Sequence, residues 1–265
     1  MKVVFMTHRG TVREENQDAV LVSGIVRMGD MDTPEVCGID FGERPILLAV
    51  IDGMGGHEGG ALAAKIVTET LAEKASRKDL FGACIDVNED ERVLRQIFAE
   101  AVRRMKAKAL GNLRLSKMGA TVSGVLLREK SALVFNCGDC RAYRFSDGNL
   151  ERITRDHSIV QELFEQEEIS EEEMRRHPRK NIVTSLISAD LGEEFELYVR
   201  EFSLCEGGSF FLCSDGVWET LPSRQLTALL AQDIPLVDLA QSLFDTLMAA
   251  SCRDNVSFIQ CCAGR

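Results

Sequence analysis

Five aspartates stand at the ends of predicted strands in this chain of 265 residues, several of them next to a glycine. Carboxylates that converge on one edge of stacked sheets would repel one another and become neutral unless cations bind among them. Oxygen ligands alone, with no cysteine or histidine at matching spacing, favour the hard cations Mg²⁺ and Mn²⁺. Two such ions about 3.5 to 4 Å apart can share a hydroxide and drive in-line displacement at phosphorus. The five are Asp18, Asp52, Asp139, Asp215 and Asp254.

Residues 51–60 place one of these carboxylates in a glycine-rich turn. The apolar segment 46–50 is typical of a buried strand, and residues 61–75 carry apolar side chains at near-helical spacing. Asp52 is therefore predicted to enter a turn of five glycines that opens a helix. Glycine lets the backbone adopt positive φ and approach a ligand closely. Taken alone, the segment fits equally well a tight turn in which Asp52 caps the helix.

Arg13 lies five residues before Asp18 on a polar connection between the first two predicted strands. An arginine side chain can hold a phosphate through two parallel hydrogen bonds. Arg13 is therefore a candidate phosphate ligand beside the carboxylates. In isolation, the same segment would be interpreted as an exposed charged loop.

The elements that position these residues are apolar strands joined by short polar turns, which indicates antiparallel sheet. Residues 24–45 are predicted to form a hairpin with an irregular end. Predicted strands cover 3–6, 19–23, 46–50, 120–127, 132–137, 142–145, 195–203, 209–213 and 256–262, and predicted helices cover 61–75, 91–110, 223–231 and 235–250.

Residues 154–192 differ from the rest of the chain because they are polar and rich in glutamate. Ser170 and Glu173 form a capping-box pattern for a short helix that ends near His177. We interpret the region as a mobile, flap-like excursion from the core. Its glutamates are typical of a solvated face.

Composition excludes several classes of protein. The formal net charge of -11 argues against a general nucleic-acid or anionic-membrane binder, and no segment has the roughly 20 apolar residues of a spanning helix. The first residues have too short an apolar stretch for a signal peptide. Nine scattered cysteines, an odd number, fit reduced thiols better than a disulfide framework. We therefore expect a cytoplasmic protein.

Eight short motifs, taken in order along the chain, resemble the bacterial PPM-type (protein phosphatase 2C) serine/threonine phosphatases. The resemblance covers residues 3–262, nearly the whole chain. The motifs are Arg13 with Asn16-Gln17-Asp18, Asp52-Gly53-Met54-Gly55-Gly56-His57, Gly119-Ala120-Thr121, Gly138-Asp139-Cys140-Arg141, Asp156-His157-Ser158, His177-Pro178 with Asn181 and Thr184, Ser214-Asp215-Gly216, and Asp254-Asn255.

This resemblance implies an α+β fold, a four-layer α-β-β-α sandwich with two central antiparallel sheets, formed by one domain over residues 1–265. It implies metal-dependent hydrolysis of phosphoserine and phosphothreonine in phosphoproteins, with a metal-bridging hydroxide as the nucleophile. The expected cofactors are two Mn²⁺ or Mg²⁺ ions with a third, weaker site. The expected partners are phosphorylated proteins, including a Ser/Thr kinase or its substrates, and we expect no nucleic acid, no membrane and a monomer.

The resemblance also assigns roles to individual residues. Asp52 would bridge both metals and the Gly53 carbonyl would bind one of them. Asp215 and Asp254 would hold the first metal, Asp18 would act on the second directly or through water, and Asp139 would bind the third. Arg13 would clamp the substrate phosphate.

Several positions depart from the family pattern. Met54 stands where many members have the histidine that serves as general acid, and His57 follows three residues later. His57 or water would then donate the proton to the leaving oxygen, and the alternative is that His57 only caps the helix. Gln17 replaces a glutamate, Cys140 replaces a serine, and Ser185 stands where an arginine is common in bacterial members.

Two other interpretations compete with the phosphatase. Cys137 and Cys140 form a Cys-x-x-Cys pattern that could be a redox pair or half a zinc site, although the pair lies between strands and Cys261-Cys262 has the wrong spacing for a second half-site. The second alternative is a catalytically weak or inactive module of the same fold that binds phosphoproteins and regulates signalling.

Overall fold

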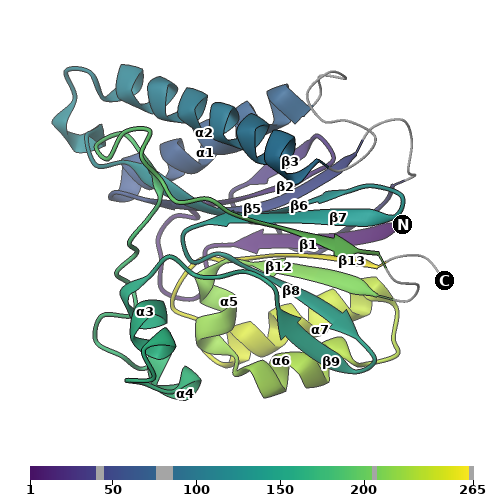
Figure 1. Ribbon diagram of the computed structural model, residues 1–265. Helices are drawn as coiled ribbons and strands as arrows, with labels where there is room; N and C mark the ends of the chain where they lie inside the picture. The colour runs from purple at the N-terminus through teal and green to yellow at the C-terminus, as the bar shows by residue number, and fades with distance from the viewer. Residues whose placement is uncertain (40–44, 76–85, 205–207, 263–265) are drawn as a thin grey trace.

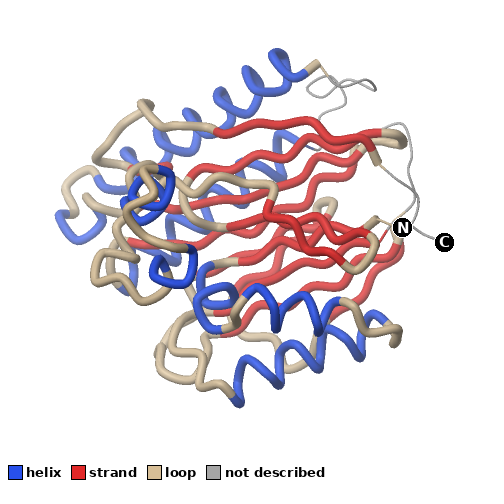
Figure 2. The backbone as a smooth tube through the Cα atoms, turned by 60° about the horizontal axis from the view of Figure 1, so that its bottom comes forward, coloured by secondary structure: helices blue, strands red, loops and turns tan. Residues whose placement is uncertain are grey.

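The computed structural model describes residues 1–39, 45–75, 86–204 and 208–262, apart from the side chains of His57 and Ala75. Two antiparallel sheets are stacked face to face between helices, so the predicted four-layer α-β-β-α sandwich is confirmed (Figures 1 and 2). None of the helices in these ranges is long and apolar enough to cross a membrane.

One sheet has helices α1 (His57–Ala75) and α2 (Val87–Ala109) on its outer face (Figure 1). A short 3-10 turn, Leu113–Leu115, follows α2. In spatial order the strands of this sheet are β11 (Tyr198–Ser203), β7 (Ser131–Cys137), β6 (Gly119–Leu127), β5 (Ile46–Met54), β2 (Asp18–Val22) and β3 (Ile25–Met28), and β10 (Ile187–Ser188) pairs with β6.

The other sheet has α5 (Asp215–Thr220), α6 (Ser223–Leu230) and α7 (Leu236–Ala249) on its outer face (Figure 1). Its strands in spatial order are β4 (Glu35–Gly38), β1 (Lys2–His8), β13 (Val256–Cys262), β12 (Ser209–Cys213), β8 (Arg141–Ser146) and β9 (Asn149–Arg152).

Strand β5 shows why its sequence is a continuous apolar run rather than an alternating one. Successive side chains of a strand point to opposite faces of the sheet. Leu48 and Val50 pack into the core between the two sheets, whereas Leu47, Ala49 and Ile51 pack beneath α1 and α2. Because both faces of β5 are covered, every position from Ile46 to Ile51 must be apolar.

Three local predictions are corrected by the structure. Residues 24–45 do not form one hairpin, because β3 pairs with β2 in one sheet and β4 pairs with β1 in the other. Strand β5 runs on to Met54, so Asp52 belongs to the strand rather than to the turn. Helix α5 was not predicted, and β11 begins at Tyr198 instead of residue 195.

Within residues 154–192, the part that carries α3 (Ile159–Glu165) and α4 (Glu171–Met174) leaves the sandwich at one end (Figure 1). The predicted excursion is too long, because Ile187–Ser188 returns to the sheet as β10. The predicted capping box is confirmed: the Ser170 hydroxyl accepts a hydrogen bond from the Glu173 amide, and the Glu173 carboxylate accepts one from the Ser170 amide. The mobility of this region and the single-domain organisation of the chain stay predictions.

Candidate active site

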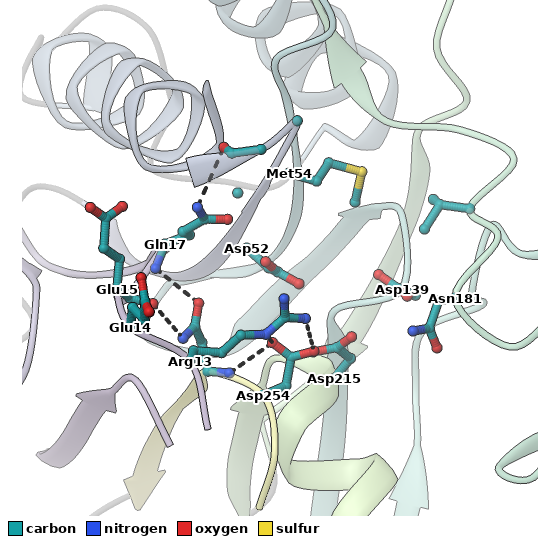
Figure 3. A pocket seen from close by; sticks show the side chains of 15 residues that line it. Arg13, Glu14, Glu15, Gln17, Asp52, Met54, Asp139, Asn181, Asp215 and Asp254 are labelled. Carbon is teal, nitrogen blue, oxygen red and sulfur yellow. Dashed lines mark hydrogen bonds and ion pairs between the residues drawn. The ribbon is translucent and has the colours of Figure 1, made fainter. Parts of the chain in front are cut away.

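A pocket of about 300 Å³ opens at one end of the sandwich and collects acidic side chains from both sheets. Its lining includes four of the five predicted aspartates together with Arg13 (Figure 3). The four are Asp52, Asp139, Asp215 and Asp254. Segments separated by about 200 positions in the sequence therefore meet at one place.

The ends of strands from both sheets supply these carboxylates. Asp52 lies near the end of β5, and Asp139 lies two residues after the end of β7 in the same sheet. From the opposite sheet, Asp215 begins α5 after β12, and Asp254 lies just before β13. Because β12 and β13 are antiparallel neighbours, Asp215 and Asp254 lie at the same edge of the sheet.

Close backbone contacts explain two of the glycines beside the aspartates. A Cβ atom on Gly53 would lie 2.1 Å from the carbonyl oxygen of Gly60 in α1. A Cβ atom on Gly216 would lie 2.0 Å from the carbonyl oxygen of Asn255. These positions exclude any side chain because the backbone at Gly53 packs against α1 and the backbone at Gly216 packs against the segment before β13. The turn itself consists of Gly55 and Gly56 only.

Asp18 has a different place from the one that its sequence position suggests. It is fully buried, lies opposite Asp52 in the β2–β5 register, and does not line the pocket. Its Oδ2 atom accepts a hydrogen bond of 2.7 Å from the Ser214 hydroxyl, which in turn accepts one from the Ser257 amide at 3.0 Å. Ser214 was missed as a site residue, although it directly precedes Asp215.

The electrostatics of the site are those of crowded, buried anions. Burial, and next the charge of Asp18, raise the pKa of Asp52 well above its ordinary range. Burial, and next the charge of Asp139, do the same to Asp215. Burial raises the pKa of Asp18 to about 6 and that of Asp139 to about 7. A bound cation would reverse these shifts because it favours the charged carboxylates.

The donor set fits a hard cation. The Oδ1 atoms of Asp18 and Asp139 are buried and have no hydrogen-bond partner among the described residues. Such unsatisfied buried oxygens are costly unless something else coordinates them. All donors are oxygens, which suits Mg²⁺ or Mn²⁺.

The arrangement of the acidic side chains is open. Within the described ranges, no three His, Cys, Asp or Glu side chains are arranged so that they could hold one ion. Arg13 instead pairs with Asp254: Nε donates to Oδ1 at 2.8 Å and Nη2 donates to Oδ2 at 2.7 Å (Figure 3). The arginine predicted to hold phosphate thus holds a predicted metal ligand here.

Asn255 fixes the loop that carries Arg13, a role that the sequence did not indicate. Its Oδ1 atom accepts a hydrogen bond from the Gln17 amide at 2.9 Å. Its Nδ2 atom donates to the carbonyl oxygens of Arg9 at 3.1 Å and Glu15 at 2.9 Å. One buried side chain therefore ties the segment before β13 to the segment before β2.

A buried arginine supports the loop of Asp139. Arg141 pairs with Asp156 at 2.6 Å, and its guanidinium carbon lies 3.6 Å from the ring centroid of Trp218. The Trp218 indole N–H donates to the Asp139 carbonyl oxygen at 3.1 Å. Because Trp218 is the single tryptophan of the sequence, its fluorescence reports on this part of the site.

The remaining pocket walls include residues that were noted only as departures or as part of a motif. Met54 and Gln17 line the pocket, as does Asn181 from the 154–192 region. His57 begins α1 next to the pocket, but its side chain lies outside the described residues. Its proposed role as proton donor stays a prediction.

The Cys-x-x-Cys pair is unsuited to redox chemistry. Both thiols are buried, and burial raises the pKa of Cys137 to about 12 and that of Cys140 well above its ordinary range. Cys140 lies 3.2 Å from the Thr121 hydroxyl, and Cys137 lies 3.7 Å from the Ser185 hydroxyl. A reactive thiol needs a lowered pKa and access, so these two act as small core residues.

Comparison with known proteins gives a consistent result. The sequence model of the family described as Protein phosphatase 2C matches residues 37–256. The chain is 27% identical to the serine/threonine phosphatase stp of Listeria welshimeri over 259 residues, covering 98% of this chain and 94% of that protein.

Solved structures agree over the same length. The serine/threonine phosphatase Stp1 of Staphylococcus aureus superposes with a TM-score of 0.83 at 27% identity, covering 99% of this chain and 95% of Stp1. The catalytic domain of the phosphatase PstP, solved in complex with two manganese ions, superposes with a TM-score of 0.74 at 24% identity and full coverage of both chains.

Proposed function

Because this chain belongs to the protein phosphatase 2C family, it is a metal-dependent protein serine/threonine phosphatase, and we propose that the acidic pocket is its active site. The observation that carries the proposal is the meeting of Asp52, Asp139, Asp215 and Asp254 with Arg13 in one pocket. Four carboxylates and an arginine together provide what phosphate hydrolysis needs, which is binding of cations and binding of the phosphate dianion.

We propose that Asp52, Asp215, Asp254 and the Gly53 carbonyl hold two Mn²⁺ or Mg²⁺ ions, with Asp139 as ligand of a third. Bound ions of this kind supply an activated water molecule at neutral pH and neutralise charge on the phosphate. The solved PstP catalytic domain holds two manganese ions, which supports two-metal occupancy. Asp18, buried behind Asp52, would act through water rather than by direct ligation.

Arg13 would orient the substrate by two parallel hydrogen bonds from its guanidinium to phosphate oxygens. Its side chain is already placed at the pocket, but it must first leave Asp254. His57 or a water molecule would donate the proton to the serine or threonine oxygen as it leaves. We expect no covalent phosphoenzyme, because the activated water molecule would be the nucleophile.

The proposed substrates are phosphoproteins, including a bacterial Ser/Thr kinase or the proteins that it phosphorylates. The relatives named serine/threonine phosphatases support this substrate class. We also propose a monomer in the cytoplasm. The seven cysteines within the described ranges are all free, as a reducing compartment would keep them.

The test is phosphate release from a phosphothreonine peptide and from p-nitrophenyl phosphate, with Mn²⁺, with Mg²⁺ and with a chelator. Asp215→Asn should abolish turnover with both substrates, whereas Asp238→Asn, an exposed aspartate on α7, should retain it. Unchanged turnover in Asp215→Asn would show the metal assignment to be wrong. A folded protein without turnover under any metal, but with affinity for the phosphopeptide, would favour the regulatory module.

A further inference from the structure

A second hollow, of about 590 Å³, adjoins the acidic pocket and shares part of its wall. Arg13, Asn181 and Asp254 line both. The second hollow continues over α5 and the loop between α7 and β13, where Lys180 and Arg253 line it. A peptide whose phosphorylated residue enters the pocket would therefore pass its neighbouring residues over this hollow, which we call the side groove.

The walls of the side groove are fixed to one another. Lys180 forms an ion pair with Glu219 of α5, and Arg175 donates to the Glu219 carbonyl oxygen at 2.7 Å. Next to the lining residues Val12 and Ser251, the amide and the hydroxyl of Thr11 donate to the Cys252 carbonyl oxygen at 2.9 and 2.8 Å. Three segments that are distant in sequence thus build a groove before any substrate arrives.

The charge of the side groove is carried by one arginine. Lys180 is paired with Glu219 and Arg13 is paired with Asp254, so these charges compensate each other within the groove. Arg253 is exposed, and among the described residues its side chain has no hydrogen-bond or ion-pair partner. One positive charge therefore remains available to a ligand in the groove.

The other side of the pocket has the opposite charge. Glu14 and Glu15 are exposed and line the pocket there. Figure 3 shows these two glutamates on the far side of Arg13 from Asn181, which borders the side groove. Neither glutamate lines the side groove, so an acidic substrate residue is repelled next to Glu14 and Glu15 and attracted where Arg253 lines the groove.

We propose that Arg253 in the side groove is a specificity subsite that binds an acidic side chain flanking the phosphorylated residue of the substrate. This inference rests on the proposed function, because it assumes that the acidic pocket receives the phosphate. The subsite makes kcat/KM depend on the charge of residues on only one side of the phosphothreonine. Acidic substrate residues that lie next to Glu14 and Glu15 would not increase kcat/KM.

The experiment compares kcat/KM for three phosphothreonine peptides of equal length at saturating Mn²⁺. One has alanines on both sides, one has glutamates only on the N-terminal side, and one has glutamates only on the C-terminal side. The wild-type enzyme should prefer one of the two acidic peptides over the alanine peptide by roughly two- to fivefold, the range of a partly exposed ion pair. The other acidic peptide should show no gain.

Charge reversal assigns the preference to one residue. Arg253→Glu should invert the preference, so that the favoured acidic peptide becomes the poorer substrate relative to the alanine peptide. Arg253→Lys should keep it because the charge is kept. Arg224→Glu makes the same charge change at an exposed residue of α6 and should leave the ratio as in the wild type.

Equal kcat/KM for all three peptides in the wild type, or a preference that survives Arg253→Glu in a protein of wild-type melting temperature, would overturn the subsite. Either result leaves the phosphatase assignment standing, since turnover is still observed. Loss of turnover on every peptide in the wild-type protein would instead overturn the proposed function on which the subsite rests.

Discussion

Replacing Arg13 with alanine should have opposite effects on metal binding and on catalysis. In the structure, the Arg13 guanidinium holds both oxygens of Asp254, a proposed ligand of the first metal. A cation can bind both oxygens of Asp254 only after this ion pair breaks. Arg13 is also the proposed phosphate ligand, so the same side chain competes with the metal and then assists the substrate.

The magnitudes follow from the exposure of the pair. The side chains of Arg13 and Asp254 are 55% and 27% exposed, so the pair contributes only about 0.2 to 1 kcal/mol. Arg13→Ala should therefore bind Mn²⁺ up to about fivefold more tightly. Losing hydrogen bonds from a charged group to phosphate costs about 1.5 to 3 kcal/mol. The variant's kcat/KM should accordingly fall by roughly 10- to 150-fold at saturating Mn²⁺.

The assays are calorimetric titration of Mn²⁺ into metal-free protein and steady-state hydrolysis of a phosphothreonine peptide. Arg9→Ala is the matched control, because Arg9 is 50% exposed on the same loop and pairs with Asp30 at 2.9 Å. It should change neither quantity by more than about twofold. Wild-type or weaker Mn²⁺ affinity in Arg13→Ala would refute the competition, and an unchanged kcat/KM would refute the phosphate role.

Three further predictions concern the stability and assembly of the site. Burial raises the pKa of Asp139 to about 7, so the folded metal-free protein binds a proton that the unfolded chain releases near pH 4, and stability falls as pH rises between these values. In the presence of a chelator, Asp139→Asn should therefore have a higher melting temperature than the wild type at pH 8 but not at pH 4. The same difference in melting temperature at both pH values would contradict this. Arg141→Ala should lower the free energy of unfolding in urea by about 3 kcal/mol, because Asp156 keeps only one weaker arginine contact in its buried position; a loss below about 1 kcal/mol would count against a structural role. Gly216→Ala should weaken Mn²⁺ binding roughly 5- to 150-fold in calorimetry, since its Cβ would push the backbone of Asn255, next to Asp254, away from Asp215, whereas Gly38→Ala, at a position that faces open space, should bind as the wild type does.

Much of the fold is readable from local sequence because its signals are local. The apolar run that begins at Ile46 marks a strand covered on both faces, and the spacing of Leu236, Leu239, Ala240 and Leu243 marks one buried face of α7. Strands β12 and β13 match their predicted bounds for the same reason. The pairing of β3 and β4 with different sheets was not predictable in this way, because strand partners are chosen by contacts far along the chain.

The candidate site likewise combines features that local sequence predicts with features that depend on contacts between distant segments. Residue types and their order were enough to predict the aspartates at strand ends, their preference for hard cations and the resemblance to a phosphatase family. The packing of distant segments places Asp18 behind the pocket, brings Asn181 to its wall, and pairs Arg13 with Asp254, 241 positions away. Such contacts depend on how two sheets stack and which loops meet at their edge, and no local pattern encodes that geometry.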